Sequence, residues 1–284
     1  MTMQHGAAPG RVAQRFLCVA AGLLALVARP SHAADGYFSP TEERVRISLG
    51  AMHVVTATTL RVDSSTGGSG TQFNGERTFG LDKSDFEPKF QAMVRAGTRQ
   101  RLTFDYFTLD RSGNTTLRGA TPIIFRDISL QPGDPLQTHL SLRTLGMTYG
   151  YSFRHSETVE IAGTFGVHVM DISTMAKVQT QTRHILQTKD QAGPVPTLGI
   201  DATWVASRRF YFDGRAQYVA VRINNLSGSL GIFELDALYR YRPNVSFAVG
   251  YNQLRAHLSL SDSSKGGLFD LNTKGPQMFF RIAF

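Results

Sequence analysis

The chain has 284 residues and carries 30 Lys and Arg against 22 Asp and Glu, a formal net charge of +8. The basic residues are scattered singly and form no patch or basic helix, which argues against a nucleic-acid-binding protein. A single cysteine, Cys18, excludes a fold held by intramolecular disulfides.

Residues 1–33 have the three parts of a secretory signal peptide. A basic start is followed by an apolar run of 13 residues, 16–28, and then by small residues up to Ala33. That run is short for a helical membrane span, which needs about 20 residues. Cys18 precedes most of the run, so we do not expect a lipoprotein signal. The prediction is cleavage after Ala33, a net charge of about +5 on the remaining chain, and a short periplasmic segment at 34–42.

The rest of the chain alternates between apolar and polar residues, the pattern of strands with two different faces. In the stretch 86–96, Phe86, Phe90 and Val94 share one face, while Glu87 and Lys89 share the other. A barrel in a membrane and a water-soluble sandwich both fit this alternation. Ten strands are predicted, at 43–62, 86–97, 100–112, 138–155, 158–176, 196–207, 209–223, 229–242, 244–261 and 274–284.

The lengths of the connections separate these two folds. Long connections are predicted at 63–85, 113–137, 177–195 and 262–273, and they alternate with short turns near Thr98, Ser156, Arg208 and Pro243. Up-and-down barrels of outer membranes have short periplasmic turns, longer outer loops and an even number of strands. The stretch from Ile123 to Leu140 could form a hairpin above the membrane or add two strands, so eight or twelve strands stay open beside ten.

The C-terminal strand carries the most informative motif. Phe280, Ile282 and the final Phe284 lie on one face, with Arg281 on the other. This ending resembles that of the bacterial outer-membrane β-barrel proteins. The resemblance implies an all-β, transmembrane, antiparallel up-and-down barrel in the outer membrane of a Gram-negative bacterium. It also implies that Phe280, Ile282 and Phe284 form the signal read by the barrel-assembly machinery.

Aromatic residues gather near the short turns, on the face assigned to lipid. Such crowding predicts a girdle at the inner membrane–water interface. The residues are Tyr151, Phe153, Trp204, Phe210, Phe212, Tyr239, Tyr241, Phe247 and Phe280.

The opposite face of the strands carries charges of both signs, which predicts a lumen crossed by ion pairs. Small residues between Gly146 and Gly166 make one wall thin, so long charged side chains from the other strands can fill a barrel of about ten strands. A narrow polar channel for ions or small solutes is the alternative. The residues predicted to line the lumen are Glu87, Lys89, Arg95, Arg101, Asp105, Arg143, Arg154, Glu160, Asp201, Asp213, Arg215, Glu234, Asp236, Arg240 and Arg281.

Two His-x-Ser pairs, His139 with Ser141 and His257 with Ser259, suggest a third class of function. They are similar to the His-x-Ser arrangement of the outer-membrane lipid A deacylases, which implies a lipid hydrolase. The sequence places no carboxylate on the same side of either strand, although a triad needs one. If Leu140 and Leu142 face lipid, His139, Ser141 and Arg143 face the lumen, and a bulge must reset the alternation before Leu145. We therefore expect no enzyme, and no metal or cofactor site is predicted.

The sequence thus predicts a largely filled barrel with an envelope-structural or surface-interaction role. Its expected partners are outer-membrane lipid and lipopolysaccharide, the assembly machinery and an unidentified extracellular ligand bound by the loops.

Overall fold

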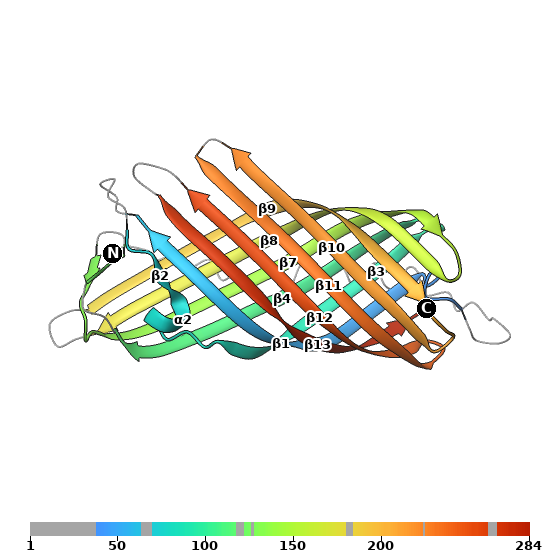
Figure 1. The fold of residues 1–284 in the computed structure, drawn as a ribbon, viewed down its shortest axis with the longest axis horizontal. Helices are drawn as coiled ribbons and strands as arrows, with labels where there is room; N and C mark the ends of the chain where they lie inside the picture. Colours follow the sequence, from blue (N-terminus) through green and yellow to red (C-terminus); the bar gives the residue numbers. More distant parts are fainter. Residues whose placement is uncertain are drawn as a thin grey trace, which may run out of the picture. The chain divides into compact units, whose positions relative to one another are not determined.

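Ten long antiparallel strands form a closed barrel in the computed structural model (Figure 1). The structure describes residues 38–63, 70–117, 122–125, 128–179, 184–223, 225–260 and 266–284. The predicted signal peptide lies outside these residues. The barrel strands are β1 (Val45–Val62), β3 (Ser84–Ala96), β4 (Gln100–Thr116), β7 (Pro135–His155), β8 (Val159–Gln179), β9 (His184–Val205), β10 (Phe210–Ile223), β11 (Leu226–Arg242), β12 (Val245–Leu260) and β13 (Gly267–Ala283).

The barrel closes where the first and last strands pair. β1 and β13 run antiparallel from the pair Arg46–Ala283 to the pair Val62–Gly267. Each long strand therefore has a neighbour on both sides. Such closure lets a β-structure cross lipid, because strand edges would leave polar backbone groups without partners in hydrocarbon.

The predicted fold class and the count of ten barrel strands are confirmed. The stretch after Ile123 adds none, because β5 (Ile123–Phe125) and β6 (Ile128–Leu130) pair only with each other. The predicted long connections at 177–195 and 262–273 are wrong, the second because β13 already begins at Gly267. β8 continues to Gln179 and β9 begins at His184, and the two strands pair over this whole length.

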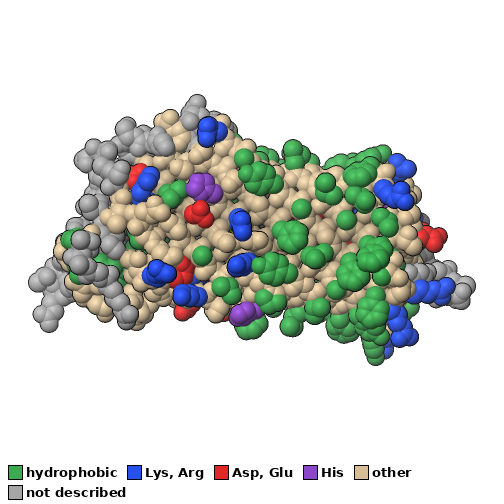
Figure 2. All heavy atoms as spheres, viewed as in Figure 1, with side chains coloured by type: hydrophobic (Ala, Val, Ile, Leu, Met, Phe, Trp, Pro, Cys, Tyr) green, Lys and Arg blue, Asp and Glu red, His purple; other side chains and the backbone are tan. Residues whose placement is uncertain are grey.

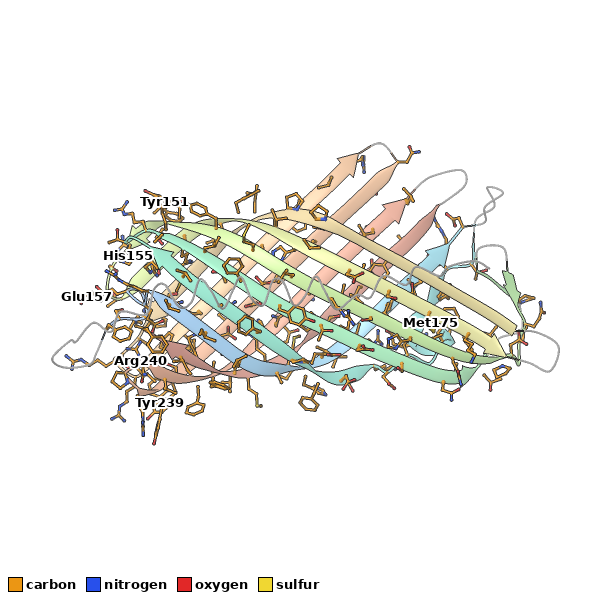
Figure 3. All side chains as sticks on the ribbon, turned by 180° about the vertical axis from the view of Figure 1, so that it is seen from behind. Tyr151, His155, Glu157, Met175, Tyr239 and Arg240 are labelled. Atoms are coloured by element: carbon orange, nitrogen blue, oxygen red, sulfur yellow. The ribbon has the colours of Figure 1, made fainter. Side chains whose placement is uncertain are left out.

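Hydrophobic side chains cover much of the outside of the barrel over the half that holds the C-terminus, whereas the other half shows few of them and carries scattered charged and His side chains (Figures 1 and 2). The aromatic residues predicted for the girdle face outward here, and Tyr151 and Tyr239 lie at the same end of the barrel (Figure 3). Phe153, Trp204 and Tyr241 are more than half exposed. An outer surface of this kind is stable only against lipid.

The polarity of the wall reverses along the barrel. Near the short turns, apolar residues face out and the inner face is mostly polar, apart from a small buried cluster of Val205, Tyr211, Leu238 and Ala248. Farther from these turns, Leu142 and Met170 are buried inside, whereas their chain neighbours Arg143 and Asp171 are exposed outside. The strands are thus longer than the membrane is thick, and their outer part has the apolar interior and polar surface of a water-soluble protein.

Two short elements, β2 (Phe73–Asn74) and α2 (Gly75–Thr78), lie in the connection between β1 and β3. The side chain of Asn74 accepts a hydrogen bond from the backbone N–H of Arg77 and caps α2. No helix among the described residues is long and apolar enough to span a membrane.

Candidate functional site

Charged side chains fill the membrane-embedded part of the lumen. Of the fifteen residues predicted to line it, all but two lie on the inner face and are buried or partly buried. The exceptions are Arg143 and Arg154, which are exposed on the outside. Arg154 lies outside because a register shift between Ser152 and Arg154 displaces the end of β7 by one residue.

Glu160 is the centre of one group of ion pairs. Its carboxylate accepts hydrogen bonds from both terminal nitrogens of Arg95, each at 2.7 Å, and from Ser152. It also lies 3.1 Å from Nη1 of Arg101. Glu160 is completely buried, so these donors replace the water that the carboxylate loses.

The ion pairs continue from Arg101 across the lumen. Nη2 of Arg101 lies 3.3 Å from Asp201, and Asp201 also binds Arg215 through two nitrogens, at 3.2 and 3.3 Å. Arg215 in turn lies 3.8 Å from Asp105. These residues come from β4, β9 and β10, so the network ties together strands that are far apart in the barrel wall.

A second group connects the opposite wall. Lys89 Nζ donates to Glu234 at 2.7 Å and to Gln277 at 3.0 Å. Gln277 donates to Asp236 at 2.6 Å, and Asn252 donates to Glu234 at 2.9 Å. The acid–base pairing predicted for the lumen is therefore present on both sides of it.

A cavity of about 50 Å³ lies among these side chains and is lined by residues of both groups, including Arg101, Asp201 and Glu234. A water molecule needs roughly 10–15 Å³ on this scale. The cavity therefore has room for a few waters and not for a solute.

The segment before β1 closes the end of the barrel that carries the short turns. Ser39, Thr41 and Glu43 are buried. Glu43 lies 2.5 Å from Arg46 and 3.1 Å from Arg240, and Arg240 also donates to the carbonyl of Phe38 at 2.7 Å. Phe38, the first described residue of the segment predicted to lie in the periplasm, is thus bound to a lumen arginine.

An apolar layer fills the outer part of the lumen. Leu109, Leu142 and Leu271 each have 0% exposure. Their side chains belong to one buried cluster, which consists of Met52, Val54, Leu109, Leu142, Met170, Leu230, Leu254, Ala256 and Leu271. The predicted lumen position of Arg143 required Leu142 to face lipid. That position is wrong, because β7 has passed the apolar belt at this point and its apolar face has become the inner one.

Above this layer, the connection between β1 and β3 is fixed to the inner wall. Arg111 on β4 is 2% exposed and donates to Glu76 of α2 at 2.8 Å. It also donates to the hydroxyl of Thr58 at 2.8 Å, and Glu76 accepts from the backbone N–H of Thr58 at 3.1 Å. Phe73 and Phe79 pack beside these groups with ring centroids 4.3 Å apart.

Both His-x-Ser pairs lie on the outside of the barrel, above the apolar belt. The sequence places no carboxylate beside either pair on its own strand, but neighbouring strands supply one to each. Nε2 of His139 lies 3.2 Å from Asp110 on β4, and Nδ1 of His257 lies 3.1 Å from Asp270 on β13. Ser112 Oγ lies 3.3 Å from Nδ1 of His139. Ser112 was not predicted, because it lies on β4 and only the pairing of β4 with β7 brings it beside His139.

No group of three or more His, Cys, Asp or Glu residues within the described ranges could hold a metal ion.

No family model matches the chain, and no curated protein matches it. Among solved structures it is similar to the outer membrane protease OmpT from Escherichia coli, with a TM-score of 0.54 and 10% identity over 85% of this chain and 97% of that one. The translocator domain of the autotransporter NalP from Neisseria meningitidis gives a TM-score of 0.43 and 8% identity over 96% and 95% of the two chains. OprG from Pseudomonas aeruginosa gives 0.36 and 10% over 88% and 98%.

The likeness to OmpT shows the fold. A closed antiparallel barrel of this fold with an apolar outer belt is a bacterial outer-membrane barrel, so the predicted class and localisation are confirmed.

Proposed function

We propose that this chain is a closed, non-conducting outer-membrane barrel with an envelope-structural and surface-interaction role. The observation that carries the proposal is the apolar layer across the lumen, in which Leu109, Leu142 and Leu271 are completely buried. The interaction surface would then be the wall and loops outside the membrane.

The apolar layer argues against the alternative of a narrow channel. An ion that entered it would lose its hydration shell and gain no polar partner, which costs several kcal/mol or more. The charged groups below are engaged with one another, as Glu160 is with Arg95 and Arg101. A barrel of about ten strands is narrow enough for its own side chains to fill.

The test is single-channel conductance of the refolded, full-length barrel in a planar bilayer, with folding confirmed by heat-shifted gel mobility. We expect no discrete current steps under conditions in which a porin conducts. Steps that scale with salt would contradict a closed lumen. The double variant Leu109→Ser with Leu142→Ser serves as the positive control, because it would admit water to the apolar layer.

Exposed cations at the outer edge of the apolar belt support lipid as a partner. Arg143, Arg255 and Lys274 are exposed on β7, β12 and β13. Each lies on the outer face within four positions of an exposed belt residue, namely Leu145, Tyr251 or Pro276. Cations at this level suit the phosphate groups of anionic lipid or lipopolysaccharide in the outer leaflet.

A further inference from the structure

A hydroxyl, an imidazole and a carboxylate meet on the outer wall of the barrel. Ser112 and Asp110 lie on β4, and His139 lies opposite Ser112 on β7. His139 Nδ1 is 3.3 Å from Ser112 Oγ, and its Nε2 is 3.2 Å from Asp110 Oδ1. The side chains of His139 and Asp110 are 41% and 54% exposed, so the imidazole and the carboxylate are not buried.

These contacts have the order of a nucleophile, a base and an orienting acid. The Asp110 carboxylate lies 3.2 Å from Nε2 of His139 and so favours, electrostatically, the tautomer that carries its proton there. Nδ1 is then free to accept a proton from the hydroxyl of Ser112. This arrangement exists only in space, because the three side chains come from two strands. The chain sequence Asp-x-Ser…His matches no motif on its own.

We propose that Ser112 is the nucleophile of an acyl-ester hydrolase site on the outer wall. Ser112 Oγ attacks the ester carbonyl as its proton passes to Nδ1 of His139. The tetrahedral intermediate collapses with cleavage of the ester C–O bond, and the leaving alkoxide takes that proton. Water, deprotonated by the same nitrogen, then hydrolyses the acyl-serine and releases the carboxylic acid. The overall reaction consumes one water and needs no other reactant.

The height of the site indicates the substrate. Ser112 and His139 lie four residues beyond the Thr108–Arg143 pair, which follows the last outward apolar pair, Tyr106–Leu145. At about 3.3 Å per residue and a strand tilt of roughly 40°, the hydroxyl lies on the order of 10 Å above Arg143. This is the polar layer of sugars and head groups outside the hydrocarbon. The substrate class is therefore a short acyl ester on a surface sugar, such as an O-acetyl group, and not the fatty-acyl ester at the hydrocarbon edge.

The second histidine provides a matched control. His257 also contacts a carboxylate, Asp270, at 3.1 Å and is similarly exposed. Ser229 on β11 lies opposite His257, but within the described part of the chain no serine hydroxyl is hydrogen-bonded to this imidazole. Ser141, which belongs to the His-x-Ser motif, lies opposite Asp110 and is 8% exposed. The geometry thus assigns the reaction to Ser112 and not to either motif serine.

The experiment measures turnover of p-nitrophenyl acetate by the refolded, full-length barrel and its labelling by a fluorophosphonate probe. Trypsin cleaves after Arg111, so the labelled peptide begins at Ser112. General-base catalysis gives roughly 10²–10⁴-fold, and an open site falls toward the lower end. We expect Ser112→Ala and His139→Ala to lower turnover at least about tenfold and to abolish the label.

Ser141→Ala and His257→Ala should leave both signals unchanged. Absence of label at Ser112 in a barrel that shows its heat-shifted mobility would overturn the proposal, as would equal turnover by Ser112→Ala. Label on Ser141 or Ser259 would also overturn it. None of these outcomes depends on conductance. The proposal of a hydrolase site and the proposal of a closed lumen can therefore be refuted independently.

Discussion

Leu142 and Arg143 are consecutive residues of β7, yet Leu142 is completely buried in the lumen and Arg143 is exposed on the outer wall. Next along the chain toward the short turn, Leu145 is 37% exposed on the lipid side, and the buried Thr144 faces inward. The strand keeps its alternation, and what changes is the surroundings. Lipid lies outside at Leu145, whereas water lies outside at Arg143.

The apolar layer predicts a large effect of truncation at Leu142. We expect Leu142→Ala to lower the free energy of unfolding by about 2–5 kcal/mol, because it leaves a cavity among fully buried neighbours. Urea unfolding in lipid vesicles measures this. Leu145→Ala, on the lipid side, is the control and should cost clearly less. Equal losses would contradict the placement of Leu142.

The pairing of Glu160 with two arginines predicts a second loss of stability. Glu160→Gln leaves Arg95 and Arg101 buried without their shared carboxylate, and breaking a buried pair in this way costs about 3–5 kcal/mol. The change is measured by the same unfolding experiment. Glu157→Gln serves as control, since Glu157 is exposed near the short turn (Figure 3). An unchanged midpoint for Glu160→Gln would refute a stabilising role of the network.

Gly250 on β12 predicts a steric effect. A Cβ at this position would collide with the carboxylate of Asp236 and the carbonyl of Leu235. Gly250→Ala should therefore destabilise the barrel by about 1–3 kcal/mol. At Gly163 a Cβ meets nothing within 4 Å, so Gly163→Ala should be near neutral. The comparison of the two variants tests whether the lumen is closely packed at Asp236.

The cations at the outer edge of the belt predict binding of anionic lipid. The triple variant Arg143→Ala, Arg255→Ala, Lys274→Ala should retain several-fold less lipopolysaccharide, with a weaker salt dependence, because each cation near an anionic surface contributes about 1 kcal/mol. Co-purification of lipopolysaccharide at increasing salt measures this. Arg242→Ala is the control, since Arg242 is exposed at the other end of the barrel. Equal retention by the triple variant would exclude the proposed phosphate contacts.

The terminal phenylalanine predicts a defect in assembly rather than in stability. Phe284 is 60% exposed, so Phe284→Ala removes little packing. We expect less barrel in the outer membrane of cells but unchanged refolding of purified protein into detergent. The amount of heat-shifted protein in membrane fractions, beside that in refolding mixtures, distinguishes the two. Normal membrane levels would argue against a recognition role for Phe284.

The sequence by itself determined the barrel. Alternation with period two, the short turns and the terminal Phe284 are local properties, and each can be read without knowing what a strand pairs with. The charges on the inner face followed from the same alternation, as for Glu160 and Asp236.

Only the tertiary structure decided where the membrane ends and which side chains meet. Leu142 seemed to face lipid because an apolar residue on a strand can face lipid or a core, and alternation does not say which. Ser112 and His139 belong to strands joined by a long connection, which leaves the register between them free. Hydrogen bonding of the two strands sets that register and brings Asp110, Ser112 and His139 into contact.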